Sequence, residues 1–419
     1  MGWPVALDDR LRVRDRLLLT ATGRLLRLGP RGLSELDGVR KGYGSRAFAR
    51  RLVDAGAAHP LPPAWPADDV TVVIPVRDRL SQLQRCLAAV DGADVLVIDD
   101  GSLDRAGVQE LCDRYGARCV RRPNGGPAAA RNSALALLRK DFVAFLDSDC
   151  VPPPGWLESL RGHLEDPRVV AVAPRVVGGA RSPLDLGPHP GRVQPGSLLS
   201  YVPTAALLVR RAALPRFDER LRYGEDVDLV WRLVDAGGTV RYDPGVVVVH
   251  EEPARMRDRL LRRFRYGTSA GPLAVRHPGR LTHLVLPPWP TAILLLVLVR
   301  RPVLAAAVAA VATGRLDRQV RNLPTSAFLT TRSVGATALG AGRALALLGP
   351  LAWVAAAHDR RAGVLLVAPF LREWSQRRPG TGPVGYTGTA LLDQAAYGAG
   401  VLAGCLAART TGPLRPRTR

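Results

Sequence analysis

Cysteine is scarce in this 419-residue chain, and its spacing is not that of a metal site or a disulfide framework. The cysteines form no C-x-x-C pair and are odd in number, which argues against both structures. The pattern fits a protein of a reducing compartment. The five cysteines stand at positions 86, 112, 119, 150 and 405.

Aromatic residues make up only 5% of the chain, and lysine occurs only at positions 41 and 140. The formal net charge is nevertheless +22, which invites nucleic acid or a membrane surface as a partner. No basic motif with interleaved aromatics is present, so we expect no nucleic-acid partner. The abundance of Ala, Arg, Gly, Pro and Val is typical of a GC-rich coding sequence, and part of the charge can reflect that composition.

The N-terminus lacks the continuous apolar run of a secretory signal. Its first residues, MGWPVALDDRLRVRDRLLLT, place charges before any such run. Disorder is not expected either, because 47% of the residues are hydrophobic and only 23% are charged. The length allows two or three domains.

Composition divides the chain into three segments. The first, 1–66, runs into the Pro-rich stretch HPLPPAWPADD. The second, 67–275, alternates apolar strands with helical stretches, which predicts a mostly parallel α/β sheet. The third, 276–419, is strongly apolar and predicts a helical region.

The predicted strands of the middle segment are continuous Val/Ile runs, which indicate a sheet with helices on both faces. Ligands of such open sheets bind beyond the carboxyl ends of the strands. The polar residues that follow each strand are therefore the candidates for a site. The strands are expected at 70–76, 93–99, 142–147, 169–174 and 246–250.

Acidic pairs follow two of these strands, in VIDDGS and in FVAFLDSDC. A turn would explain either motif alone, because Asp and Ser are good turn formers. The alternative is a divalent cation, which prefers carboxylate oxygens together with the phosphates of a substrate. The repetition at matched strand ends favours a site for a nucleotide and its diphosphate.

Two further stretches suit such a site. The loop NGGPAAARN opens a helix with Arg131 one turn in, where a guanidinium would neutralise phosphate charge. YGEDVDLVWRL begins an amphipathic helix with Asp226. Helix capping would account for acidic residues there, and the alternative is a general base for an acceptor hydroxyl.

The ordered set IPVRDR, VIDDGS, NGGPAAARN, FLDSD, YGEDVDLVWRL and VVVVH resembles the family-2 glycosyltransferases with the GT-A fold, over roughly residues 70–265. The resemblance implies an inverting enzyme that uses Mg²⁺ or Mn²⁺ and a UDP-sugar. Asp226 would be the catalytic base, and Asp149 and His250 would bind the metal. The donor nucleotide would be held by Pro75, Val76, Arg77, Asp99, Asp100, Arg131, Asp147 and Ser148.

The sequence departs from the family pattern in two places. The first strand ends with Arg77 and Asp78 where P-x-Y-N is commoner, so this loop departs from the family at a position assigned to the donor nucleotide. The Q-x-x-R-W motif of processive enzymes is absent, and RRFRYG at 262–267 is only a loose basic analogue.

The flanking segments extend the resemblance. The whole architecture is similar to the mycofactocin-system glycosyltransferases of actinobacteria. This similarity implies UDP-glucose as donor and a peptide-derived redox cofactor as acceptor, with extension to an oligosaccharide. Segment 1–66 resembles small winged-helix domains that bind precursor peptides. A packing appendage and a DNA-binding winged helix are the alternatives for it.

Two other functions stay open for the whole chain. One is a cell-envelope glycosyltransferase that acts on a lipid-linked or polysaccharide acceptor. The other is a non-catalytic protein that binds nucleotide sugars, for which Asp226 would not be required.

The apolar stretches of the third segment are interrupted. Residues 284–299 include three prolines and fall short of the roughly 20 residues of a membrane span. A buried helical domain is therefore one expectation. The other is membrane contact, because residues 254–267 combine six arginines with apolar positions. We favour a protein at the cell membrane with its catalytic domain facing the cytoplasm, and a soluble cytoplasmic protein is the alternative.

Overall fold

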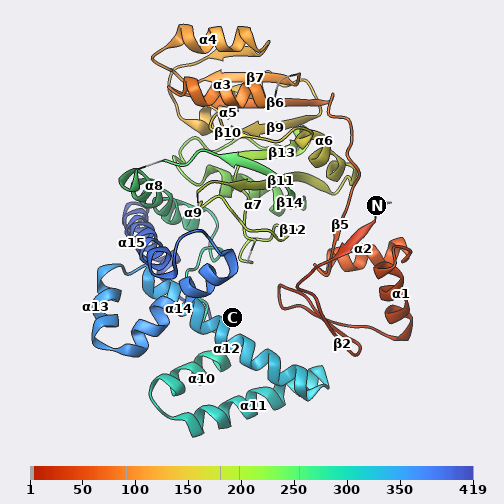
Figure 1. The fold of residues 1–419 in the computed structure, drawn as a ribbon, viewed down its shortest axis with the longest axis vertical. Coiled ribbons are helices and arrows are strands. Elements are labelled where there is room, and N and C mark those ends of the chain that lie inside the picture. Colours follow the sequence, from red (N-terminus) through yellow and green to blue (C-terminus); the bar gives the residue numbers. More distant parts are fainter. Residues whose placement is uncertain (1–3, 91, 180, 198, 254, 419) are drawn as a thin grey trace. The chain divides into compact units, whose positions relative to one another are not determined.

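The computed structural model describes residues 4–90, 92–179, 181–197, 199–253 and 255–418. The chain forms two compact units, Met1–Glu252 and Pro253–Arg419, which we call the first and the second unit (Figure 1). The N-terminal segment and the large sheet thus belong to one unit. The finer division into 1–66, 67–275 and 276–419 stays a prediction.

The N-terminal part of the first unit is winged-helix-like. Its core includes Leu18, Leu36, Phe48 and Leu52, which are all buried. The side chain of Ser45 caps the second helix by accepting a hydrogen bond from the backbone N–H of Phe48. Strands β1 (Val5–Leu7) and β5 (Ala58–Pro60) pair, strands β2 (Arg12–Arg14), β3 (Leu17–Leu19) and β4 (Leu25–Arg27) form a small antiparallel sheet, and helices α1 (Pro30–Arg40) and α2 (Arg46–Asp54) follow.

The Pro-rich stretch after β5 lies against the large domain. The backbone N–H of Trp65 donates to the carbonyl oxygen of Glu158 at 2.9 Å. A Cβ atom at Gly162 would come within 2.1 Å of the carbonyl oxygen of Pro63, so only glycine allows this approach. The stretch is therefore fastened along its length and is not a free tether.

The described residues form one nine-stranded sheet in the order β10-β14-β11-β13-β9-β6-β7-β8, with β12 paired to β14. All strands except β10, β12 and β13 run in the same direction, which confirms the predicted mostly parallel sheet. The strands are β6 (Val70–Val76), β7 (Asp94–Asp99), β8 (Arg118–Arg121), β9 (Phe142–Leu146), β10 (Cys150–Val151), β11 (Val169–Val177), β12 (Gly191–Arg192), β13 (Ala206–Arg210) and β14 (Thr239–His250).

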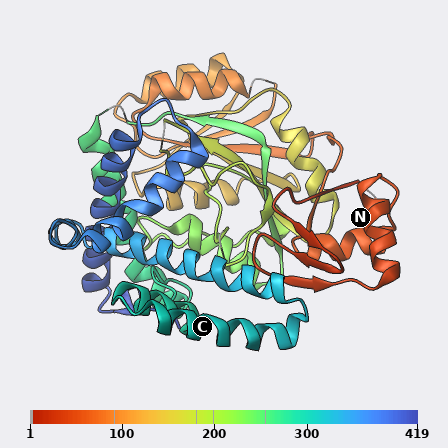
Figure 2. The same ribbon diagram turned by 60° about the horizontal axis from the view of Figure 1, so that its bottom comes forward.

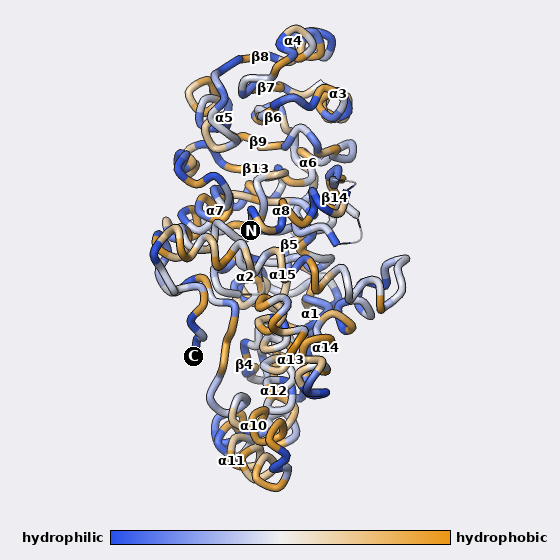
Figure 3. Tube along the Cα trace, turned by 90° about the vertical axis from the view of Figure 1, so that its left-hand side faces the viewer, coloured by the Kyte–Doolittle hydropathy of each residue, from blue (hydrophilic) through white to orange (hydrophobic). Residues whose placement is uncertain are grey.

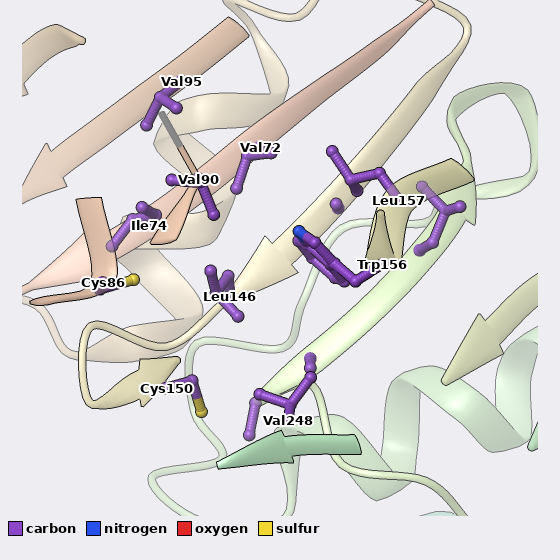
Figure 4. Close-up of a cluster of buried hydrophobic side chains, with 14 of the residues drawn as sticks. Val72, Ile74, Cys86, Val90, Val95, Leu146, Cys150, Trp156, Leu157 and Val248 are labelled. Atoms are coloured by element: carbon purple, nitrogen blue, oxygen red, sulfur yellow. The ribbon is translucent and has the colours of Figure 1, made fainter. Parts of the chain in front are cut away.

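Helices cover both faces of this sheet. Helices α5 and α7 lie on one face, and α3 and α6 lie on the other (Figure 3). Alternate residues of the strands, such as Val72, Ile74, Leu146 and Val248, pack with Trp156 in the core on the α3 and α6 side (Figure 4). The helices are α3 (Leu80–Ala89), α4 (Arg105–Arg114), α5 (Pro127–Leu135), α6 (Trp156–Arg161) and α7 (Glu225–Asp235).

The second unit is helical, as the apolar composition predicted. Helices α10, α11 and α12 pack side by side as successive hairpins (Figures 1 and 2). The helices are α8 (Met256–Thr268), α9 (Ala270–Arg276), α10 (Pro288–Leu298), α11 (Pro302–Val320), α12 (Leu323–Ala346), α13 (Pro350–His358), α14 (Arg360–Arg377) and α15 (Pro383–Ala407).

Glycines bring α8 and α9 into backbone contact with α15. A Cβ atom at Gly400 would lie 2.0 Å from the carbonyl oxygen of Phe264, and one at Gly404 would lie 2.2 Å from that of Thr268. Gly271 is equally close to the backbone of Gly404. Small residues four positions apart are a common means of close helix packing.

The net positive charge of the chain resides almost entirely in the second unit. Residues 253–419 contain 24 arginines, no lysine and five acidic residues, which gives +19. Residues 1–252 contain 35 basic and 32 acidic residues, which gives +3. Arginine is about equally frequent in both units, so the division reflects the scarcity of acidic residues in the second unit.

The second unit also exposes apolar side chains. On α10 and α11, which Figure 3 colours as largely hydrophobic, five such side chains are more than half exposed. Among the described residues, α15 alone is long and apolar enough to cross a membrane, and 33% of its most apolar window is buried. The exposed side chains on α10 and α11 are Leu295, Val297, Val303, Leu304 and Val311.

Candidate active site

The carboxyl ends of β6, β7 and β9 meet at one edge of the sheet, because β6 pairs in parallel with both neighbours. Val76 lies directly opposite Asp99, and Pro75 lies opposite Ile98. Arg77 follows, with its Nε atom 3.5 Å from a carboxylate oxygen of Asp78. The strand-end residues singled out in the sequence are thus brought together here.

Asp99 and Asp100 are buried and fully engaged within the protein. Asp99 accepts a hydrogen bond from the backbone N–H of Ser102 at 2.8 Å and pairs with Arg121. Asp100 pairs with Arg122 and accepts from the N–H groups of Gly125 and Gly126, at 3.0 and 2.7 Å. Asp100 therefore shapes the Gly-rich loop that opens α5, and its contact with a donor nucleotide stays a prediction.

Arg131 connects the second acidic motif to helix α7. The arginine side chain is only 3% exposed, and its Nη2 atom donates to Asp147 at 2.7 Å. Its Nη1 atom donates to Glu225 at 3.0 Å. The sequence predicted that Arg131 neutralises phosphate; in the structure it neutralises two carboxylates, and a direct phosphate contact stays a prediction.

The register of β10 against β14 places Asp149 beside His250. Cys150 lies directly opposite His250, and the N–H of Glu251 donates to the carbonyl oxygen of Asp149 at 2.9 Å. The Oδ2 atom of Asp149 is 3.6 Å from Nε2 of His250 and also contacts Arg79. Ser148 is buried in the turn between the two aspartates.

The pKa of Asp149 reflects these neighbours. Burial alone would raise the pKa of this carboxyl, but the neighbouring imidazole of His250 and the charge of Arg79 bring it below the ordinary value. Asp149 is thus ionised at neutral pH, as a metal ligand must be.

Asp149 and His250 fit a divalent cation that is held jointly with a substrate. Within the residues that the structure describes, no three His, Cys, Asp or Glu side chains are grouped closely enough to hold a metal ion by themselves. Mg²⁺ commonly takes one or two protein carboxylates and completes its shell with phosphate oxygens and water. Glu252, 3.4 Å from Nδ1 of His250, would orient the imidazole.

Asp226 lies at the start of α7, in a different environment from its acidic neighbours. Glu225 pairs with Arg131, and Asp228 pairs with Arg232 at 2.8 Å. Asp226 has no ion-pair partner in the described part of the chain and accepts a hydrogen bond only from the N–H of Val227. Burial, and next the charge of Glu225, raise the pKa of Asp226 to about 7.

A carboxylate with a pKa near neutrality is suited to take up a proton at physiological pH. Burial also raises the pKa of Glu225, although the charge of Arg131 opposes this effect. Since the two carboxyls interact, they titrate as a pair. Of the three acidic residues at the start of α7, Asp226 alone has a raised pKa and no ion pair with an arginine among the described residues, so it is the candidate base.

Sequence reasoning did not identify three side chains that hold this site. Arg79 pairs with Asp149, and Glu252 contacts His250. Asn132 both donates to and accepts from the backbone of Phe217, at 2.9 and 2.8 Å, and so fixes the loop that leads to α7. Arg79 and Asn132 occur within the motifs IPVRDR and NGGPAAARN, but their partners are 70 and 85 residues away and local patterns cannot show them.

Comparison with known proteins gives results consistent with this geometry. A family model described as Glycosyl transferase family 2 matches residues 71–207. Pre-mycofactocin glycosyltransferase of Mycobacterium tuberculosis is 41% identical over an alignment that covers 100% of this chain and 98% of that protein. Glycosyltransferase AglE of Haloferax volcanii is 29% identical over 47% of this chain and 71% of AglE.

Solved structures resemble the chain more distantly. Glucosyl-3-phosphoglycerate synthase from Mycobacterium tuberculosis is 17% identical with a TM-score of 0.38, over 49% of this chain and 79% of that one. A likeness at this level carries no argument about the site.

Proposed function

The chain belongs to glycosyl transferase family 2, and we propose that it transfers glucose from UDP-glucose to a peptide-derived redox cofactor of the mycofactocin type, with inversion at the sugar carbon. Repeated transfer would build an oligosaccharide. The observation that carries the acceptor assignment is the similarity to pre-mycofactocin glycosyltransferase, which extends through both flanking segments as well as the sheet.

The geometry supports a single displacement. Asp226 would accept the proton of the acceptor hydroxyl as its oxygen forms a bond to the anomeric carbon. The bond from that carbon to UDP breaks on the opposite side, and UDP leaves with the electron pair. Attack from the side opposite to the leaving group inverts the configuration of the sugar.

Other residues of the chain would position the reactants. Arg131 holds Asp147 and Glu225 in place, so the D-x-D turn and helix α7 keep a fixed relation. Asp149 and His250 would hold Mg²⁺ or Mn²⁺ against the diphosphate. When bound, this metal offsets the negative charge that develops on the departing UDP.

The direct test uses the purified full-length protein, pre-mycofactocin and a series of UDP- and GDP-sugars with Mg²⁺ or Mn²⁺. We expect UDP release from UDP-glucose to depend on the acceptor, and the acceptor to gain the mass of a hexose. Transfer only to lipid-linked or polysaccharide acceptors would favour a cell-envelope enzyme instead. Sugar-nucleotide binding without turnover of any acceptor would indicate a binding protein.

The N-terminal part would hold the peptide-derived acceptor. In support, the relative that shares it is named pre-mycofactocin glycosyltransferase, and the fastened Pro-rich stretch keeps this part next to the sheet. If so, its role is to raise the local acceptor concentration, and changes on its surface would raise the acceptor KM with little effect on kcat.

We also infer that the protein associates with the cell membrane through the second unit, with the first unit on the cytoplasmic side where UDP-sugars are found. A net charge of +19 suits an anionic lipid surface, and exposed apolar side chains on α10 and α11 suit its interfacial region. This arrangement does not require α15 to cross the membrane.

A further inference from the structure

A pocket lies between the N-terminal part of the first unit and the large sheet, at the amino-terminal ends of β11 and β14. Its walls include Arg50 from α2, together with Arg192 and Arg241 from the sheet. Along the partner strand β11, Val172 lies opposite Arg241 and Val177 lies opposite Val249, so at about 3.3 Å per residue the pocket is roughly 20 Å from His250 in the candidate active site. It is therefore a separate place on the molecule.

The acidic side chains of this pocket are already paired. Arg50 contacts Asp166 at 2.6 Å, and Arg168 contacts Asp54 at 3.2 Å. These pairs join α2 to the loop before β11. They leave the two arginines of the sheet without a carboxylate within ion-pair distance among the described residues.

Arg192 and Arg241 lie directly opposite each other on the antiparallel strands β12 and β14. Side chains at opposite positions project from the same face a few ångströms apart, where like charges destabilise the pair. Arg192 is exposed, whereas Arg241 is only 5% exposed. An arrangement of this kind costs stability unless something negative lies between the two guanidinium groups.

The hydrogen bonding of Arg241 also indicates that this pocket suits a negatively charged group. Its buried Nε atom has no hydrogen-bond partner among the residues that the structure describes, and an unsatisfied buried donor is costly. Burial lowers the pKa of Arg241 to about 10, because the charges of Asp243 and Asp166 only partly offset burial and the repulsion from Arg192 and Arg50. The pocket thus presents an unsatisfied donor and an excess of positive charge.

We propose that Arg192 and Arg241 form a binding site for a small oxyanion, either a phosphate or a carboxylate group. The planar guanidinium fork matches both kinds of oxyanion and can bind them through two parallel hydrogen bonds. A bound oxyanion would satisfy Nε of Arg241, cancel the repulsion and strengthen the junction of the N-terminal part with the sheet. Its source is free phosphate or, if the proposed function is right, a carboxylate carried by the acceptor.

The test is thermal unfolding of the full chain in inorganic phosphate or in acetate, each compared with sodium chloride of equal ionic strength. We expect the unfolding temperature of the wild type to rise with the oxyanion concentration and then to reach a plateau. Arg192→Gln is the decisive variant because this side chain is exposed and its replacement should not prevent folding. Without the oxyanion the variant should unfold at a higher temperature than the wild type, since one of two facing charges is gone.

With the oxyanion present, the wild type should instead unfold at a higher temperature than Arg192→Gln. The apparent affinity of the variant for the oxyanion should be about tenfold weaker, because its charged hydrogen bonds are lost. Arg105→Gln, an exposed arginine on α4, is the matched control and should follow the wild type throughout. Saturation by phosphate alone would identify a phosphate source, and saturation by acetate a carboxylate source.

The proposal is overturned if neither anion exceeds the chloride control, or if Arg192→Gln responds as the wild type does. Arg241→Gln should lose the same response; if it fails to fold, the result for Arg192→Gln still decides. Neither readout depends on glycosyl transfer, so failure here would leave the proposed function intact.

Discussion

Arg131 donates a hydrogen bond to Asp147 across 2.7 Å, from a position where only 3% of the arginine side chain is exposed. The same guanidinium reaches Glu225, which begins helix α7. One buried cation therefore fixes the distance between the turn that would bind the donor and the helix that carries the candidate base.

Replacing this arginine should damage both stability and function. Arg131→Ala leaves the buried carboxylate of Glu225 and the half-buried carboxylate of Asp147 without their cation, and breaking a buried ion pair costs about 3–5 kcal/mol. Urea unfolding should show this loss. Arg220→Ala, an exposed arginine, is the control and should change the free energy of unfolding by less than about 0.5 kcal/mol. Similar values for the two variants would contradict the bridging role.

Asp226→Asn should reduce kcat by on the order of a hundredfold or more, because the amide keeps the shape but cannot accept the hydroxyl proton. UDP-sugar binding should survive, since the residues of the D-x-D turn are unchanged. Steady-state kinetics and calorimetric titration of the donor measure the two effects. Turnover close to that of the wild type would indicate that another residue is the base.

The pH dependence should identify the same carboxyl. Burial and the charge of Glu225 raise the pKa of Asp226 to about 7. Because the base acts in its ionised form, kcat/KM of the wild type should rise with pH through about 7 and then level off. Asp226→Asn should not show this rise. A flat wild-type profile between pH 5 and 8 would exclude Asp226 as the group observed.

Stability should change in the opposite direction over this range. A carboxyl whose pKa is raised in the folded state contributes stability below its ordinary pKa and loses it as the pH rises through the raised value. Asp226→Asn escapes that loss, so the variant should gain stability relative to the wild type between pH 5 and 8. Chemical unfolding of both proteins across this range gives the comparison.

Asp149→Ala should abolish metal-dependent binding of UDP, because a methyl group supplies neither a ligand oxygen nor a charge to offset the cation. Calorimetric titration with UDP and Mn²⁺ is the measurement. Arg85→Ala, which removes a neighbouring exposed ion pair with Glu251, should bind UDP and Mn²⁺ normally. Unchanged affinity in Asp149→Ala would refute the metal assignment.

Gly400→Val should destabilise the second unit, because the backbone of α8 occupies the space that the side chain needs. Overpacking of this kind costs about 1–3 kcal/mol or more. On the same helix, no atom of the described residues outside the helix lies within 4 Å of a Cβ placed at Gly388, so Gly388→Ala should be neutral or stabilise by up to about 1 kcal/mol. Thermal unfolding compares them, and equal effects would show that α8 and α15 are not in contact.

The full chain should sediment with vesicles that contain phosphatidylglycerol and not with vesicles of phosphatidylcholine alone. Replacing Arg300 and Arg301 together by Gln should weaken binding by roughly 1 kcal/mol for each arginine. Arg105→Gln in the first unit is the control with one charge removed and should bind as the wild type does. Equal binding to both kinds of vesicle would contradict the role of charge.

The hydrophobic runs of the sequence were enough to place the main strands and the edge where they end. Predicted strands 70–76, 93–99 and 142–147 agree to within a residue with β6, β7 and β9, because buried parallel strands are continuously apolar. Strand β13 was not predicted. It enters the sheet antiparallel between β9 and β11, and its position depends on pairing that no local pattern records.

The contacts that define the site were beyond sequence reasoning for the same reason. Asp149 and His250 meet because of the register between β10 and β14, and Arg131 meets Glu225 across 94 residues of chain. Residue type suggested the chemistry of each group, but only the fold shows which carboxylates already have an arginine. That difference is what separates Asp226 from Glu225 and Asp228.

The second unit holds its positive charge on arginine alone. A guanidinium keeps its proton at every pH that a cell experiences, and lysine acetylation has no substrate in this unit. Neither a fall in pH nor lysine acetylation could therefore remove the positive charge that would attract it to an anionic surface. If the second unit binds a membrane as proposed, the amount of acidic phospholipid in that membrane would be one variable that sets how much protein is bound.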